Sequence, residues 1–289
     1  MASAFEHATS PAKVSRVVTT YGHWQLINRW LSEERLLQSN VSWIFVNDKP
    51  DDPLPDEMKD RINRFGQVIQ PKVNLGRCCA RNLGVQASNS IWIDIIDGDD
   101  IPLPLADDFD IEAEESGFIY FDVTHHYFQQ GQIINDADEG WFPPHLNQLL
   151  FDLIGNYDPR PIAVMWRRST FNALGGFDGR TDYVEDFNLV MRALLSGYKY
   201  TKLNQRKGSC QRVPSGRTRP PIVAVANLHN WELARSLANE TTLSAVNDQI
   251  KFWRKAILWA GMREMEKSKP SLQAKLREAA KWLVGIYSK

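Results

Sequence analysis

The first third of the chain alternates apolar runs with amphipathic stretches, and this alternation limits the possible folds more than any other feature. Apolar runs rich in β-branched residues predict strands, and stretches with a helical repeat of apolar residues lie between them. The predicted strands span 14–20, 41–46, 67–70 and 90–96, and the predicted helices span 24–37, 58–65 and 77–87. This order predicts an α/β fold, a doubly wound, mostly parallel sheet with flanking helices.

Beyond residue 110 the pattern is less regular. We predict strands and helices here too, at 117–128, 161–166 and 198–203 for strands and at 146–154, 169–174 and 184–195 for helices. Residues 205–221 form a predicted basic loop, and a helical pattern predominates from residue 230 onward. We therefore divide the chain into two halves of one domain, 1–110 and 111–225, followed by a helical C-terminal extension, 226–289.

Composition excludes several classes of protein. The net charge of −1 provides no basic field for a nucleic-acid partner. No apolar run reaches the ~18 residues of a membrane span, and residues 1–14 lack the pattern of a secretory signal. The three cysteines, Cys78, Cys79 and Cys210, lack the spacing of zinc ligands or a disulfide framework. We expect a cytoplasmic protein.

An acidic triplet follows the fourth predicted strand, in the sequence IWIDIIDGDD at 91–100. Carboxylates this close repel each other unless a cation lies between them, and two carboxylates plus substrate phosphates are a usual way to hold Mg²⁺. Gly98 allows a tight turn and the approach of a phosphate. A solvated acidic turn, or a turn capped by Asp97, explains the residues equally well. From these residues alone, both interpretations stay open.

The triplet resembles the D-x-D element of glycosyltransferase family 2, whose members have the GT-A fold. Four further pieces are similar to elements of that family and occur in the same order: VSRVVTTYG at 14–22, IFVNDKPDD at 44–52, NLGRCCARNLG at 74–84, and GGFD at 175–178 followed by Glu185-Asp186. The resemblance spans roughly residues 14–205. It implies an inverting glycosyltransferase that takes its sugar from a nucleoside diphosphate, with UDP as the expected carrier, and uses Mn²⁺ or Mg²⁺.

The resemblance also assigns residues to the donor site. Asp48 would accept a hydrogen bond from the donor base, and Arg81 would pair with the base or the diphosphate. Asp97 and Asp99 would hold the metal. The remaining donor-site residues implied in this way are Thr20, Tyr21, Asn74, Gly76 and Arg212. Ordinary structural roles compete with these, since Asp48 can be a loop acid and Arg81 a helix-surface arginine.

Four positions qualify this assignment. Asn47 stands where the family usually has Asp, which weakens the case for base recognition. A family histidine is absent from the basic loop, so we expect no third protein ligand for the metal there. His229 could replace it but is more simply structural, and Arg77 is taken as a solvated side chain.

The catalytic base expected from the resemblance is Asp186, which would take the proton of the acceptor hydroxyl. Glu185 would orient the acceptor or the base. The competing explanation is that both acids stabilise a helix N-terminus. His125 and His126 are adjacent in a predicted strand and point to opposite faces, so they cannot easily share one metal, although one could line the acceptor site.

The expected acceptor is a glycan or lipid-linked sugar in polysaccharide or glycoconjugate biosynthesis. The Q-x-x-R-W motif of processive members is missing, which favours single addition. The C-terminal extension mixes Trp with Lys and Arg, which indicates packing or a homodimer contact, or peripheral attachment to an anionic membrane. A nucleotide-sugar-binding protein without catalysis is an alternative. A sugar-phosphate nucleotidyltransferase is another, although residues 19–23 contain only one glycine.

Overall fold

The structure, a computed structural model, describes most of the chain. The described residues are 12–33, 36–38, 40–105, 115–129, 132–139, 161–181, 184–212, 220–240 and 242–267. The helix predicted at 146–154, the central part of the predicted basic loop and residues 268–289 lie outside them. Within the described residues, no helix combines the length and apolar character needed to cross a membrane.

The N-terminal half follows the predicted alternation of strands and helices. Its elements are β1 (Val14–Thr20), α1 (Trp24–Leu31), β2 (Val41–Asn47), α2 (Asp56–Ile62), β3 (Gly66–Ile69), α3 (Arg77–Gln86) and β4 (Trp92–Asp97). Helix α1 ends before the predicted residue 37 because the Ser32 hydroxyl donates to the Arg29 carbonyl, 2.6 Å away, and closes the last turn. The strand–helix order was therefore predicted correctly and one helix was predicted too long.

The second half contains the predicted strands and helices other than the one at 146–154, with shifted bounds, and also strands at 101–102 and 132–139 that the sequence did not indicate. It comprises β5 (Ile101–Pro102), β6 (Phe118–Gln129), β7 (Gln132–Glu139), η2 (Pro161–Ala163), β8 (Val164–Arg167), α5 (Arg168–Ala173), η3 (Gly179–Thr181), α6 (Glu185–Leu195), β9 (Tyr200–Arg212), α7 (Pro220–Ala234) and α8 (Leu243–Lys267). The prediction of a loop from residue 205 was wrong up to residue 212, because this segment continues β9 and pairs with β6 and β5.

The described strands form one nine-stranded sheet in the order β3-β2-β1-β4-β8-β6-β9-β5, with β7 paired to β6. Strands β3, β2, β1 and β4 are parallel to one another. Strand β8 is antiparallel to both β4 and β6, and β6 is parallel to β9. Six strands thus share one direction, which confirms the predicted mostly parallel α/β sheet.

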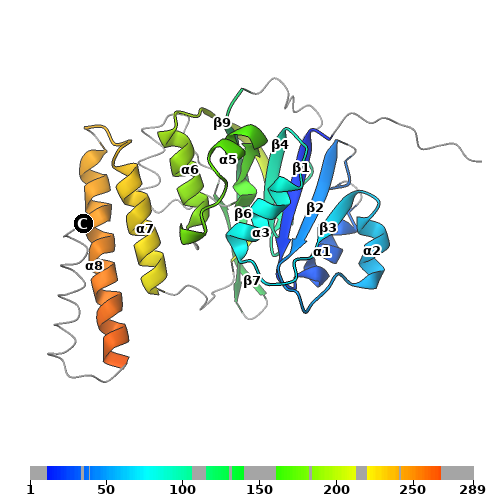
Figure 1. The fold of residues 1–289 in the computed structure, drawn as a ribbon, viewed down its shortest axis with the longest axis horizontal. Coiled ribbons are helices and arrows are strands. Elements are labelled where there is room, and N and C mark those ends of the chain that lie inside the picture. The colour runs from blue at the N-terminus through cyan, green and yellow to red at the C-terminus, as the bar shows by residue number, and fades with distance from the viewer. Residues whose placement is uncertain are drawn as a thin grey trace, which may run out of the picture.

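Helices flank this sheet, and the last three lie side by side at one end of the molecule. Helix α3 packs against β1 and β2, where a Cβ on Gly84 would lie only 2.3 Å from Cγ1 of Val17. Only glycine allows this close approach of helix and strand. At the other end, α7 lies between α6 and α8 (Figure 1). The predicted boundary at residue 226 falls inside α7, which begins at Pro220.

A buried ionic cluster ties the two halves of the sheet together. Asp94 of β4 accepts hydrogen bonds from Nε of Arg16 at 3.1 Å and from Nζ of Lys207 at 2.6 Å. All three side chains are at most 1% exposed. Arg16 also donates to the Leu103 carbonyl at 2.6 Å. The cluster therefore fixes β9 against β1 and β4, on the sheet face opposite α3.

Candidate active site

Three parallel strands end together at one edge of the sheet. The register pairs Thr20 of β1 with Asn47 of β2, and Thr19 of β1 with Asp97 of β4. Ligands of open α/β sheets bind outside the carboxyl ends of such strands. The turn of the acidic triplet is attached to this edge, since the Gly98 amide donates to the Thr19 carbonyl at 2.7 Å.

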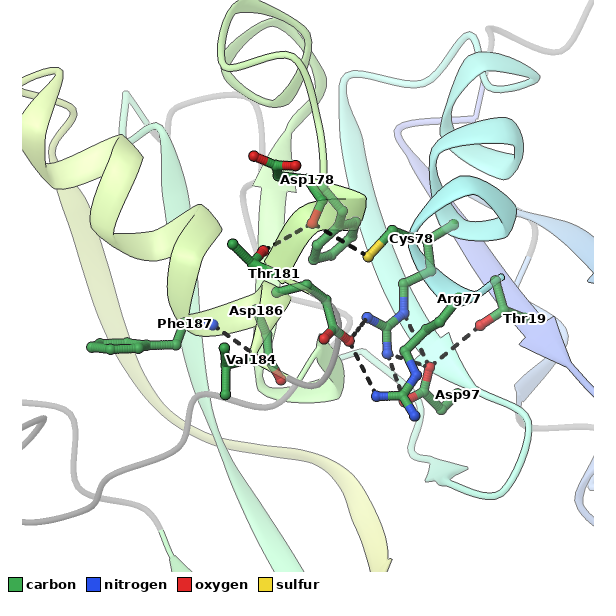
Figure 2. Close-up of polar contacts among 12 residues, drawn as sticks. Thr19, Arg77, Cys78, Asp97, Asp178, Thr181, Val184, Asp186 and Phe187 are labelled. Atoms are coloured by element: carbon green, nitrogen blue, oxygen red, sulfur yellow. Dashed lines mark hydrogen bonds and ion pairs between the residues drawn. The ribbon is translucent and has the colours of Figure 1, made fainter. Parts of the chain in front are cut away.

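Arg81 is the centre of the charged network at this edge. Its Nη2 donates to both carboxylate oxygens of Asp97, at 2.7 and 2.8 Å, and its Nη1 donates to Oε1 of Glu185 at 2.6 Å. Arg77 also donates to Oε1 of Glu185, at 3.3 Å, and Thr19 donates to Asp97 at 3.3 Å. In Figure 2, Thr19 of β1, Arg77 of α3 and Asp97 of β4 lie together, and dashed lines mark the contacts of this network. The network joins residues 104 positions apart in the sequence.

The charges of this network keep its members ionised despite burial. Burial opposes the charged form of Arg81, but Asp97 and Glu185 raise its pKa above the ordinary value. Burial likewise opposes ionisation of Glu185, and the charges of Arg81 and Arg77 outweigh it and lower the pKa of that carboxyl. Glu185 is 1% exposed, and its Oε2 has no hydrogen-bond partner. It is a fixed carboxylate that is poorly suited to exchange protons.

Asp97 and Asp99 form a donor set that fits a divalent cation. The Asp97 side chain remains 28% exposed although Arg81 holds it, and Asp99 is exposed. The pKa of Asp99 is raised, first because the surrounding protein removes part of its hydration and then because Asp97 repels a second negative charge. A cation would relieve this repulsion, and hard carboxylate oxygens suit Mg²⁺ or Mn²⁺. Among the described residues, no group of three or more His, Cys, Asp or Glu could hold a metal.

Asp48 organises the loop after β2. Its Oδ1 accepts the Leu75 amide at 2.6 Å, and its Oδ2 accepts Nδ2 of Asn74 at 3.1 Å. Asn47 is fully buried, and its amide donates to the Asp52 carbonyl at 2.6 Å. Asp48 and Asn74 thus fix the segment that leads into α3, with Gly76 as the residue before the helix.

Thr20 and Tyr21 lie at the carboxyl end of β1 in different environments. Thr20 is buried, and its hydroxyl accepts the His23 amide at 3.0 Å, so it shapes the turn after β1. Tyr21 is 53% exposed, and Nζ of Lys49 lies 6.0 Å from its ring centre. An exposed aromatic ring at this edge offers a flat apolar surface to a ligand.

The segment before α6 is fastened to α3. Asn82 accepts the Phe177 amide and donates to the Phe177 carbonyl, both at 2.9 Å. A Cβ on Gly176, which has φ +71°, would meet Oδ1 of Asn82 at 2.5 Å, so glycine is required here. The two motifs NLGRCCARNLG and GGFD are therefore bonded directly to each other. This contact helps to bring Glu185 and Asp186 to the sheet edge.

Asp186 lies in the first turn of α6, beside Glu185, and is 9% exposed. Its Oδ1 accepts the Phe187 amide at 3.0 Å. Glu185 is hydrogen-bonded to Arg81, whereas Asp186 acts on Arg81 through its charge, which helps to raise the pKa of that guanidinium.

Two solved structures of S. aureus TarS residues 1–349 are similar to this chain. One has TM-score 0.61, 16% identity and coverage of 92% of this chain and 78% of that one. The other, in complex with UDP-GlcNAc, has TM-score 0.62, 15% identity and coverage of 92% and 79%. The mannosyltransferase PcManGT from Pyrobaculum calidifontis, in complex with GDP-Man and Mn²⁺, has TM-score 0.52, 14% identity and coverage of 96% and 82%.

The chain has the GT-A glycosyltransferase fold. No family model matches it, and no curated protein matches it in sequence. Within the GT-A fold, the expected site residues Thr20, Asp48, Asn74 and Asp97 lie along the ends of the parallel strands, and Arg81 and Glu185 join them there. His229 is exposed on α7, and of Arg212 only the place in β9 is described.

Sequence reasoning missed two parts of this GT-A structure. Arg77, taken as a solvated side chain, is 45% exposed but contacts Glu185. Its spacing of four residues from Arg81 places both on one face of α3, and that spacing was the available signal. Only one sequence feature pointed to the Arg16–Asp94–Lys207 cluster, namely the presence of charged residues within otherwise apolar predicted strands.

Proposed function

We propose that the protein is a metal-dependent inverting glycosyltransferase. It would move a sugar from a nucleoside-diphosphate sugar, with UDP as the expected carrier, to a hydroxyl of a glycan or lipid-linked acceptor. The observation that carries the proposal is the contact of Arg81 with both Asp97 and Glu185, which brings the acidic triplet and the Glu185-Asp186 pair to one sheet edge. Structures of similar fold contain UDP-GlcNAc, and GDP-Man with Mn²⁺, which supports a nucleotide-sugar donor.

The donor nucleoside would bind at the ends of β1 and β2. Tyr21 offers an exposed ring for stacking against the base, and the loop fixed by Asp48 and Asn74 supplies polar atoms beside it. Asp48 already accepts two hydrogen bonds from the protein, so any base contact would use its remaining lone pairs. Thr20 and Gly76 shape the adjacent turns, and Arg212, expected from the resemblance alone, would contact the diphosphate.

The diphosphate would lie against the acidic triplet. Asp97 and Asp99 would hold Mn²⁺ or Mg²⁺, which when bound offsets the charge that builds on the departing nucleoside diphosphate. Arg81 holds Asp97 in place through two hydrogen bonds from Nη2 and one from Nε. Arg77, partly exposed beside it, adds positive charge near the leaving group.

Asp186 would act as the general base. It would take the proton of the acceptor hydroxyl while the oxygen forms a bond to the anomeric carbon. The bond from that carbon to the phosphate oxygen breaks, and its electron pair leaves with the nucleoside diphosphate. Attack from the opposite face inverts the configuration. Glu185, ionised and fixed by two arginines, would orient this segment and not exchange protons.

A thermal-shift panel of UDP, GDP and their sugars, with and without Mn²⁺, tests the donor site. We expect stabilisation by at least one nucleoside diphosphate that increases with Mn²⁺ and is lost in the double variant Asp97→Asn/Asp99→Asn. Products then separate the reaction classes, because sugar transfer releases a nucleoside diphosphate and nucleotidyl transfer releases pyrophosphate. Binding without any turnover of any donor–acceptor pair would support the binding-protein alternative instead.

A further inference from the structure

Helix α7 contacts the segments on both sides of the Glu185-Asp186 pair. It belongs to the C-terminal part of the chain, where the sequence indicated only packing, a dimer contact or membrane attachment. In the structure it lies directly beside α6, between α6 and α8 (Figure 1). Val184 precedes the pair and Phe187 follows it, and each meets a different residue of α7.

Asn230 makes the polar part of this contact. Its side chain is fully buried, its Nδ2 donates to the Val184 carbonyl at 3.2 Å, and its Oδ1 accepts Nδ2 of Asn188 at 3.0 Å. A buried amide with both ends paired is costly to disrupt, since each partner would lose a hydrogen bond away from water. One α7 side chain therefore holds the backbone just before Glu185 and the helix face just after Asp186.

The residue before α6 has no side chain that could cap the N-terminus of this helix. Val184 is the residue before the helix, and no side-chain hydrogen bond caps this end. The Val184 carbonyl accepts both the Asn188 amide, at 3.0 Å, and the Asn230 amide nitrogen. Asn230 thus adds a contact to a helix end that is also held by the arginine contacts of Glu185 and by the Asp186 carboxylate, which accepts the Phe187 amide.

Trp231 makes the apolar part of the contact. Its ring centre lies 5.5 Å from that of Phe187, at an interplanar angle of 55°, and both side chains are at most 5% exposed. Phe187 is the residue whose amide donates to the Asp186 carboxylate. The position of that amide, and with it the orientation of Asp186, depends on where Trp231 holds Phe187.

We propose that Asn230 and Trp231 are positioning residues for Asp186, so that α7 belongs to the catalytic unit and not to a separate extension. The inference rests on the proposed function, in which Asp186 is the base. General-base catalysis needs the carboxylate within hydrogen-bond reach of the attacking hydroxyl, and a displacement of about 1 Å costs on the order of 100-fold in rate. The donor residues lie on β1, α3, β4 and β9 and in the loops after β1, after β2 and before α3, whereas the contacts of Asn230 and Trp231 described above are with Val184 and α6.

The test compares Asn230→Ala and Trp231→Leu with wild type and with His229→Ala, an exposed neighbour on the same helix. Turnover uses the donor and acceptor pair that wild type accepts, and donor binding is measured with UDP or GDP plus Mn²⁺. We expect kcat to fall roughly 10- to 100-fold in both variants, in line with small displacements of a catalytic group. The Kd of the nucleotide, and all properties of His229→Ala, should stay within about two-fold, the spread expected of unrelated surface changes.

The shape of the pH profile adds a readout that simple destabilisation does not move. The acidic limb of kcat reports the base in the enzyme–substrate complex, so it should shift in Asn230→Ala, whose Asp186 has changed surroundings. Unchanged kcat and pH profile in both folded variants would overturn the inference. So would equal losses of kcat and nucleotide binding, which would indicate a general structural role. If Asn230→Ala does not fold, Trp231→Leu decides by the same criteria.

The failure of this inference is distinguishable from the failure of the proposed function. If wild type is active and Asp186→Asn is inactive while Asn230→Ala and Trp231→Leu keep full kcat, only the role of α7 is wrong. If Asp186→Asn keeps full activity, the assignment of the base is wrong and the inference falls with it.

Discussion

Two adjacent carboxylates, Glu185 and Asp186, differ in their hydrogen-bond partners, and this difference bears on the roles proposed for them. Glu185 is buried against two guanidinium groups that hold it ionised. Asp186 is 9% exposed and accepts the Phe187 amide, and its charge also acts on Arg81. A base must gain and lose a proton during turnover, which a carboxylate fixed by two cations does poorly. This contrast supports the proposal that Asp186 is the base, which the sequence supported by resemblance alone.

At the scale of single residues, replacing Arg81 tests the charged network that it forms with Asp97 and Glu185. Arg81→Ala should destabilise the protein by about 3–5 kcal/mol, because Asp97 and Glu185 would lose their buried partner. Nucleotide binding should fall as well, since Asp97 would lose the contacts that orient it. Urea unfolding and thermal shift with UDP or GDP measure the two effects. The control Arg180→Ala removes an exposed partner of Asp178 and should cost no more than about 1 kcal/mol. Equal stability of the two variants would contradict the account.

The pH dependence of stability tests the state of Glu185. Its pKa is lower in the folded protein than the ordinary 4.5, so its contribution to stability is present above that pH and is lost as the pH falls through the folded value. We expect the free energy of unfolding to decrease below about pH 4.5. Glu185→Gln should show a shallower decrease in denaturant titrations at pH 7 and pH 4. An unchanged slope in the variant would show that Glu185 is not held ionised.

At the scale of secondary-structure elements, the N-terminal half was predictable and β9 was not. Strands β1, β2 and β4 are apolar runs buried on both faces, and periodicity detects these well. The part of β9 from residue 205 contains arginine, lysine, serine and glutamine, a pattern typical of a loop. It is a strand because it pairs with β6 and β5, and Lys207 also binds Asp94, a contact over 113 residues that no local pattern reveals.

Removing the charge of Asp94 tests this ionic cluster. Asp94→Asn should destabilise the protein by about 3–5 kcal/mol, because Arg16 and Lys207 would remain buried without their counterion. The double variant Asp94→Asn/Lys207→Met should recover part of the loss, since it removes one of the two cations. Denaturant unfolding measures both variants. The control is Asp122→Asn on β6, whose partner Lys202 is less deeply buried. A double variant less stable than Asp94→Asn alone would refute the explanation.

At the scale of the whole molecule, the sheet edge gathers residues from Thr19 to Asp186, and helices α6, α7 and α8 stack beside it (Figure 1). The doubly wound fold class was predictable from the order of strands and helices. The position of the site was predictable because the carboxyl ends of parallel strands meet at one edge of the sheet. The contact of α7 with the Glu185-Asp186 segment was not predictable, because it depends on buried Asn230 far along the chain. The acceptor, the division into halves and any dimer or membrane contact of the extension stay expectations.

The most direct measurement of the central claim compares the products of wild type and Asp186→Asn. With a nucleotide sugar and acceptor that wild type uses, the account predicts a nucleoside diphosphate and a glycoside of inverted anomeric configuration. It predicts loss of transfer by about 100-fold or more in Asp186→Asn, the usual contribution of a general base. Binding of the nucleotide with Mn²⁺ should persist in that variant. Retained configuration, or full transfer by Asp186→Asn, would contradict the account.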